Sequence, residues 1–230
     1  MIINLNKSDK APIGHSGYYR LTGCEKLAYL FRRVQATVIS NGSELERMIC
    51  GSAIQSGVKV LQGGQSEDFI SHFRSTESCL VYFDKLHISK SALAEAGVPL
   101  ASKNRISVDG VWILPDKSVL VCEYKDGDGF DTKKSDAEIK SLQKILKWLD
   151  FSGVKSRRAI MVLWNCDDLK ESSVKSREAR KYLATAQDFI DLLPLGSLNR
   201  QEINEERYLH RIQNKRLIVE YIQEQILEIL

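Results

Sequence analysis

Two apolar segments joined by a turn sequence restrict the fold of this 230-residue chain more than any other feature. Residues 106–114 and 119–125 are rich in Val, Ile and aromatic side chains, as buried strands are. Between them stands Pro115-Asp116-Lys117-Ser118, whose residue types favour a tight turn. The pattern therefore predicts an antiparallel pair of strands in the interior of the protein.

Helical and strand-like segments alternate on both sides of this pair. Residues 133–150 place their apolar side chains on one face, which is typical of a helix packed on a core. Further helices are expected at 24–35, 44–55, 91–96, 178–192 and 201–230, and further strands at 58–61 and 159–164. This order predicts an α/β fold, with a mixed central β-sheet flanked by helices and an added C-terminal helical region.

A capping box is expected at the start of the helix at 44–55. Asn41-Gly42 favours an interruption of the chain, and Ser43 is followed three residues later by Glu46. A Ser at the N-cap and a Glu at the third helical position satisfy each other's backbone N–H groups.

Composition excludes several classes of protein. There are 33 Lys+Arg and 30 Asp+Glu residues, a net charge of only +3, which excludes both a polycation and an acidic solubilising protein. We expect neither a membrane span nor a signal peptide, because no apolar segment has the required length or place. The five cysteines form no CxxC pair and the four histidines are isolated, so a cytoplasmic protein with reduced thiols is expected.

Two charged residues occupy the end of the second predicted strand. Glu123 and Lys125 lie two positions apart and therefore on the same face as Val121. Burying a carboxylate and an ammonium group there is costly unless a site uses them. The strand pairing brings Asp109 opposite Tyr124 or, with a shift of one residue, beside Glu123 or diagonal to it, and cross-strand neighbours lie about 4.5–5.5 Å apart.

Two carboxylates at that distance repel each other unless a cation lies between them. Oxygen ligands suit Mg²⁺, which keeps several waters and accepts substrate phosphate. Lys125 would then bind the scissile phosphate or lower the pKa of the attacking water. The pattern thus predicts metal-assisted hydrolysis of a phosphodiester.

Asp109 with Glu123-Tyr124-Lys125 resembles the D…(D/E)xK signature of the PD-(D/E)xK nuclease superfamily. The segment Gly42–Arg47 is similar to the G-S-x-x-E-R start of the first helix in archaeal Holliday-junction resolvases. That helix contributes a further catalytic Glu, which matches Glu46. The resemblance implies a restriction-endonuclease-like core and Mg²⁺, or Mn²⁺ in its place, held by Asp109, Glu123 and, directly or through water, Glu46. It implies the catalytic residues Glu46, Asp109, Glu123 and Lys125.

The chain departs from that pattern in two ways. Val108-Asp109 replaces the literal Pro-Asp, and the literal Pro115-Asp116 falls in the predicted turn. The additions at 62–105 and at the C-terminus are more typical of type II restriction endonucleases than of resolvases. We expect a nuclease core at 1–196 with an insertion at about 62–105, and a C-terminal helix at 197–230 as a candidate dimerisation element.

Basic residues gather after the predicted site. Residues 133–181 hold 13 Lys+Arg and 7 Asp+Glu, and phosphate neutralisation dominates non-specific DNA affinity. The expected DNA-binding residues are Lys133, Lys134, Lys140, Lys144, Arg157 and Arg158. In the last helix, apolar residues recur with 4-3 spacing, which fits packing on the own core or pairing with a second subunit. These positions are Tyr208, Ile212, Lys215, Val219, Ile222, Ile226 and Ile229, of which Lys215 is the one polar position.

We therefore expect a Mg²⁺-dependent endonuclease, a homodimer of restriction–modification type that cuts double-stranded DNA at a specific sequence. A structure-specific nuclease of junctions or repair remains an alternative, as does a non-cleaving nucleic-acid-binding protein; RNA is not excluded as substrate. Simpler interpretations of the residues also stay open: a turn at Asp109-Gly110, a solvated ion pair of Glu123 with Lys125, and a capping role for Glu46.

Overall fold

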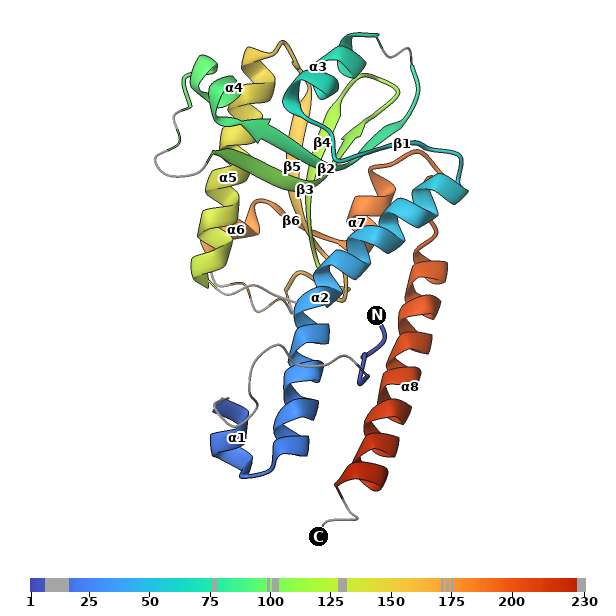
Figure 1. Cartoon of the computed structure of the whole chain (residues 1–230). Coiled ribbons are helices and arrows are strands. Elements are labelled where there is room, and N and C mark those ends of the chain that lie inside the picture. The colour runs from blue at the N-terminus through green and yellow to red at the C-terminus, as the bar shows by residue number, and fades with distance from the viewer. Residues whose placement is uncertain are drawn as a thin grey trace. The chain divides into compact units, whose positions relative to one another are not determined.

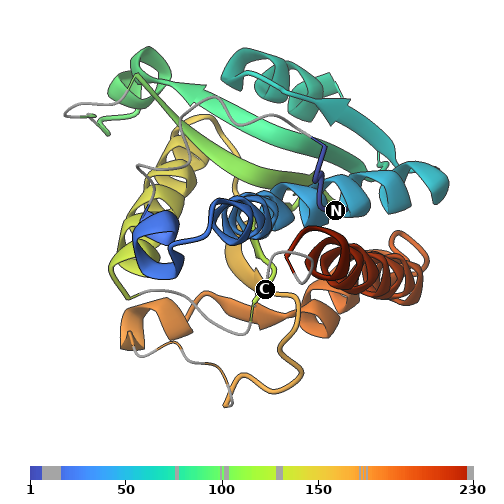
Figure 2. The same ribbon diagram turned by 60° about the horizontal axis from the view of Figure 1, so that its bottom comes forward.

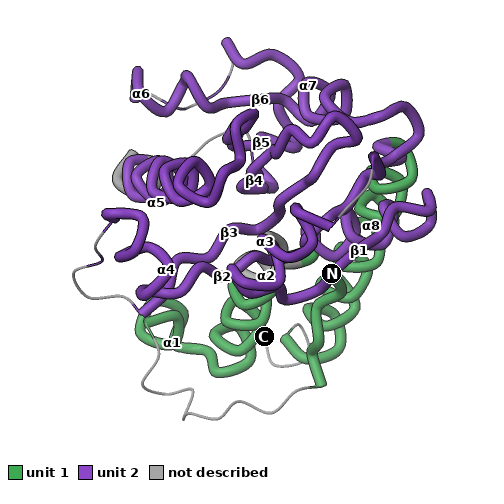
Figure 3. The backbone as a smooth tube through the Cα atoms, turned by 90° about the horizontal axis from the view of Figure 1, so that it is seen from above, with its two compact units in different colours: residues 1–44, 201–230 green, residues 45–200 purple. Residues whose placement is uncertain are grey.

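The computed structural model describes residues 1–6, 17–75, 78–98, 100, 104–127, 132–170, 172, 174 and 176–226 (Figure 1). The side chains of 38–43 and 132–135 lie outside this description. The chain divides into two compact units: unit 1 comprises residues 1–44 and 201–230, and unit 2 comprises residues 45–200 (Figure 3).

Unit 2 is built on a six-stranded sheet whose strands follow the order of the chain. β2 pairs antiparallel with β3 and β3 with β4, whereas β1–β2, β4–β5 and β5–β6 are parallel pairs. The strands are β1 (Lys59–Gln62), β2 (Val81–Ser89), β3 (Arg105–Ile113), β4 (Val119–Lys125), β5 (Arg157–Leu163) and β6 (Leu183–Thr185). The predicted α/β fold with a mixed sheet is thereby confirmed.

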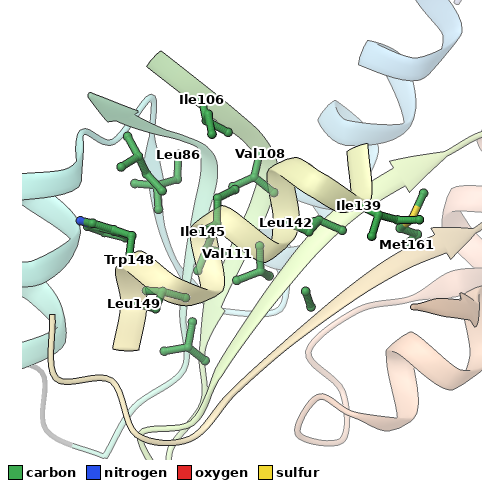
Figure 4. Packing of buried hydrophobic residues seen from close by; sticks show 14 of the residues in the cluster. Leu86, Ile106, Val108, Val111, Ile139, Leu142, Ile145, Trp148, Leu149 and Met161 are labelled. Carbon is green, nitrogen blue, oxygen red and sulfur yellow. The ribbon is translucent and has the colours of Figure 1, made fainter. Parts of the chain in front are cut away.

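Helices surround this sheet within unit 2. α3 (Ser66–Ser75) lies near the β1–β2 edge, and α6 (Arg177–Arg180) and α7 (Ala186–Asp191) near the β6 edge (Figure 2). α4 (Lys90–Glu95) follows β2, and α5 (Thr132–Phe151) connects β4 to β5. A crossover helix between parallel strands covers one face of a sheet. As expected from the periodicity, the apolar face of α5 packs on buried side chains such as Val108 and Val111 (Figure 4).

Aromatic rings fill the core near β2, β3, β4 and α7. Tyr82 stacks on Trp112 with ring centroids 4.2 Å apart, and the Trp112 Nε1–H donates to the Tyr124 hydroxyl at 2.9 Å. Phe189 of α7 contacts both Trp112 and Tyr124. Gly110 lies beneath these rings, where a Cβ atom would come within 2.7 Å of the Tyr124 hydroxyl and 2.8 Å of the Tyr82 ring.

We expect Gly110→Ala to lower the free energy of unfolding by about 1–3 kcal/mol, because overpacking a buried site forces rings and backbone to shift. Urea denaturation measures this change. Gly51 is the matched control: it lies in a helix with nothing within 4 Å of an added Cβ, so Gly51→Ala should stabilise by up to about 1 kcal/mol. Equal stability of Gly110→Ala and the parent protein would contradict the packing described.

The two N-terminal helices predicted from the sequence are one helix, α2 (Glu25–Gln55). The backbone of residues 41–43 is helical, so the expected capping box at Ser43 and Glu46 is wrong; the Ser43 side chain itself lies outside the described residues. Gly and Ser in a helix cost about 1 kcal/mol or less each. Leu45, Ile49 and Ala53 recur every four positions and are buried. Their burial favours continuation of the helix through the Gly and Ser residues.

Two other segments differ from expectation. The helix expected at 178–192 consists of α6, β6 and α7, because β6 pairs with Met161–Leu163 and Thr185 then begins α7 with a capping box to Asp188. Residues 62–105, expected as an insertion, contain β2, which pairs with β3 over most of its length. This segment is therefore part of the sheet.

Unit 1 contains α1 (Gly17–Thr22), the first part of α2 and most of α8 (Arg200–Gln225). Residues 1–44 thus group with the C-terminal helix and not with the sheet, unlike the expected division at 196. In α8, Tyr208, Ile212 and Val219 are exposed. Ile226, directly after the helix, is buried, and Ile229 lies outside the described residues. Among the described helices, none combines the length and the apolar character that crossing a membrane requires.

Candidate active site

The carboxylates predicted from the sequence meet on neighbouring strands of unit 2. Gly110 pairs with Cys122, and this register, extended by one residue, sets Asp109 opposite Glu123. This corrects the first of the two predicted registers, which set Asp109 opposite Tyr124, and agrees with the second. The Asp109 carboxylate accepts a hydrogen bond from the backbone N–H of Tyr124 at 3.0 Å, which fixes its position at the edge of β4.

Glu123 is a buried acid, with only 8% of its surface exposed. Burial raises its pKa, and the negative charge of Asp109 and a hydrogen bond between the two carboxyl groups raise the pKa further. The nearby ammonium group of Lys125, at 3.8 Å, opposes these effects without cancelling them. Glu123 therefore retains a proton unless another cation comes close.

This proton gives stability a measurable pH dependence in EDTA. A carboxyl with a raised pKa stays protonated in the folded state while the unfolded state ionises above the ordinary value of 4.5. The unfolded state then binds fewer protons, so stability falls as the pH rises through and above that value. We expect Glu123→Gln to be more stable than the parent protein, by on the order of 1–3 kcal/mol at pH 7–8, with no advantage at pH 4.

Urea denaturation at both pH values checks this expectation. Glu67, on an exposed position of α3, supplies the control variant Glu67→Gln, which should differ little from the parent protein at either pH. A Glu123→Gln protein that is less stable than its parent at pH 8 would contradict the raised pKa of a buried carboxyl group at this position.

Lys125 is held by an acid that the sequence analysis missed. Its Nζ atom lies 2.8 Å from Glu138 Oε1, and Glu138 comes from the beginning of α5. Burial lowers the pKa of Lys125, but the hydrogen bond to Glu138 and the charge of Glu123 outweigh burial, so the pKa is raised. Lys125 is thus an ammonium ion and not a general base. The other carboxylate oxygen of Glu138 is buried without a hydrogen-bond partner in the described structure.

Glu46 reaches the same site from α2. Burial raises its pKa, and the negative charge of Asp109 raises it further. Glu46 Oε2 also lies 3.3 Å from the Nζ atom of Lys85. Because no helix begins at residue 44, the capping interpretation of Glu46 no longer applies.

Two further residues of this site come from β2. Asp84 pairs with Gly110 in register, and burial raises the pKa of its carboxyl group while Lys85 lowers it. Lys85 has a φ of 67°, a left-handed conformation that costs a non-glycine residue about 1–2 kcal/mol. No sequence pattern marks either residue, because the apolar run at 79–83 ends before them and only the pairing with β3 brings them to Asp109.

The structure brings together Glu46, Asp109, Glu123 and Lys125, but it does not place all of the expected DNA-binding residues near them. Arg157 and Arg158 pair with the beginning of β4, six residues or about 20 Å along the strand from the Lys125 end. The Arg157 guanidinium donates to the carbonyls of Leu146, Val154 and Lys155, and forms an ion pair with Asp150 at 2.9 Å.

The guanidinium group of Arg157 thus joins α5 to β5, and its expected role in DNA binding stays a prediction. On α5, Lys140 is exposed and Lys144 is half-buried, whereas the side chains of Lys133 and Lys134 lie outside the described residues. Asp116 accepts hydrogen bonds from the N–H and the hydroxyl of Ser118 in the turn, so the literal Pro-Asp pair has a local structural role.

Within the described residues, no three or more His, Cys, Asp or Glu side chains are arranged as a ready metal site. The available oxygen ligands are instead the carboxyl groups of Asp109 and Glu123, with that of Glu46 nearby. Such a set of carboxylate oxygens can hold a hard cation whose other ligands are water and a phosphate group.

Comparison with known proteins gives one informative match. The chain is 37% identical over 137 residues to the type II restriction enzyme HhaII of Haemophilus parahaemolyticus. The match covers 57% of this chain and 55% of that enzyme, so it spans about half the length of the curated relative. No family model matches the sequence, and no solved structure matches it.

Proposed function

We propose that the protein is a metal-dependent DNA endonuclease of the type II restriction class, which hydrolyses phosphodiester bonds in double-stranded DNA at a specific sequence. The observation that carries this proposal is the pair formed by the half-buried Asp109 and the buried Glu123 beside the ammonium group of Lys125. The similarity to a protein named as a type II restriction enzyme supports it for about half of the chain.

The donor set fits Mg²⁺, with Mn²⁺ as a substitute. Burial of Glu123 and the negative charge of the neighbouring Asp109 raise the pKa of Glu123, and a divalent cation between the two carboxyl groups would remove their repulsion. Mg²⁺ is commonly bound through one or two carboxylates plus water and substrate phosphate, so a site with fewer than three ready ligands is compatible with it. Asp109 and Glu123 would hold the ion, and Glu46 would orient one of its waters.

Each protein group has a distinct task in this proposal. When bound, the metal ion supplies a Lewis acid for the phosphate and lowers the pKa of a water molecule. Asp109 is fixed by the Tyr124 N–H, so its carboxylate is in place before substrate arrives. Lys125 stays charged and neutralises an oxygen of the scissile phosphate, while Glu138 holds its Nζ atom at 2.8 Å.

We also propose a homodimer that acts in the cytoplasm. The exposed apolar residues Tyr208, Ile212 and Val219 of α8 support pairing with a second copy. A two-fold dimer presents two equal sites to the two strands of a symmetric DNA sequence. Lys140 and Lys144 of α5 would contribute to phosphate binding.

Cleavage of supercoiled plasmid DNA tests the proposal. We expect linear and shorter products with Mg²⁺ or Mn²⁺ and intact plasmid with EDTA. A four-way junction cut faster than any linear duplex would favour the structure-specific alternative. DNA binding without metal-dependent cleavage of any DNA would instead favour a protein that binds nucleic acid without cutting it.

A further inference from the structure

Lys85 has a backbone conformation that its residue type rarely adopts. Its φ of 67° falls in the left-handed region, in the middle of strand β2. Pairing with β3 is regular on both sides, at Asp84 with Gly110 and at Leu86 with Val108, but not at Lys85. Strained residues of this kind persist where the surrounding structure holds them, and they gather at binding and catalytic sites.

The position of Lys85 relates it directly to the carboxylates. The register of β2 and β3, which is the same on both sides, sets Lys85 opposite Asp109. Its Nζ atom lies 3.3 Å from Glu46 Oε2, and its positive charge lowers the pKa of Glu46 and of Asp84. Lys85 and Lys125 therefore bring positive charge to Asp109 from its two neighbouring strands.

These two lysines differ in how firmly the protein holds them. Lys125 lies 2.8 Å from Glu138, and 27% of its side chain is exposed. Lys85 makes a longer contact with Glu46, and 47% of its side chain is exposed. The ammonium group of Lys85 thus has more freedom to turn towards a ligand at the surface.

The charges around the site indicate the kind of ligand that Lys85 would bind. Four acidic residues other than the protonated Glu123, namely Glu46, Asp84, Asp109 and Glu138, oppose the approach of a DNA backbone. Lys125 is already engaged by Glu138 and lies near Glu123. We propose that Lys85 binds a phosphate group of the DNA backbone beside the reacting phosphodiester. The proposal rests on the proposed nuclease function and adds a second cationic group that contacts its substrate.

Two variants separate the charge of Lys85 from its backbone conformation. Lys85→Met keeps the length of the side chain and the left-handed strain but removes the charge. Lys85→Gly removes both the charge and the strain. Lys117 provides the matched control, because it is also a lysine with a positive φ, 62°, and it lies exposed in the β3–β4 turn.

The measurement is kcat/KM for plasmid cleavage with Mg²⁺ at several KCl concentrations. We expect Lys85→Met and Lys85→Gly each to lower kcat/KM by about 10–100-fold, the loss of one charge-assisted hydrogen bond. Lys85→Arg should recover most of this loss, and Lys117→Met should stay within about twofold of the parent protein. In a plot of log KM against log [KCl], Lys85→Met should lower the slope by about 0.9, the share of one phosphate contact.

A structural role alone would leave that salt dependence unchanged. Parent-like kcat/KM in Lys85→Met, full activity in Lys85→Gly, or an unchanged salt slope would each overturn the inference while leaving the nuclease proposal standing. Absence of cleavage by the parent protein would overturn both proposals.

Discussion

Replacing Asp109 with Asn should abolish metal-dependent DNA cleavage, with a loss of at least about a thousandfold in kcat, on the scale of an essential electrostatic group. Asn keeps the size of the side chain and an oxygen that can accept the hydrogen bond from the Tyr124 N–H. The substitution removes the negative charge that a divalent cation requires. The fold should therefore persist while the metal ion is lost from the Asp109–Glu123 pair.

Asp116→Asn is the matched control for this variant. Asp116 belongs to the literal Pro-Asp pair but lies in the turn, where its hydrogen bonds go to Ser118. Its activity should equal that of the parent protein in the same plasmid assay. Loss of activity in Asp116→Asn with normal activity in Asp109→Asn would reverse the assignment of the catalytic Asp.

Removal of Lys125 should have the second large effect. We expect Lys125→Ala to lower kcat by about 100–1,000-fold, because the scissile phosphate loses its ammonium partner. The variant should also be less stable, since Glu138 and Glu123 lose the cation that lies 2.8 and 3.8 Å from them. A low activity in this variant alone could therefore result either from the loss of the phosphate contact or from the loss of stability.

The double variant Lys125→Ala/Glu138→Ala separates these explanations. Removing Glu138 as well removes a partly buried charge that has lost its partner, so stability measured by urea denaturation should rise above that of Lys125→Ala. Cleavage should remain as low as in the single variant. If cleavage returned together with stability, Lys125 would serve the fold and not the reaction.

The hairpin and its charged end were predictable because their signals are local. Alternation along β4 puts Glu123 and Lys125 on one face, and the turn sequence brings Asp109 to the same place within one residue of register. In the structure Gly110 pairs with Cys122, so Asp109 lies opposite Glu123, one residue away from the register in which it would face Tyr124. The helix at 133–150 and the strand at 159–164 were equally clear, since each has a simple apolar pattern.

The residues that sequence reasoning missed reach the site through contacts that no local pattern indicates. Lys85 lies opposite Asp109 only because β2 pairs with β3, and α4 separates these two strands in the chain. Glu138 contacts Lys125 from the beginning of α5, and no motif in the sequence marks that contact. Glu46 was expected near the site for a reason that partly failed: the helix that carries it begins at Glu25 and not at Ser43.

The most direct test of the central claim is to incubate the purified protein with a long DNA of known sequence and Mg²⁺, and to sequence the ends of the fragments. We expect a discrete set of fragments whose ends share one short, symmetric sequence, and no fragments with EDTA or with the Asp109→Asn variant. Fragment ends distributed at random, or cleavage that persists in Asp109→Asn, would contradict that claim.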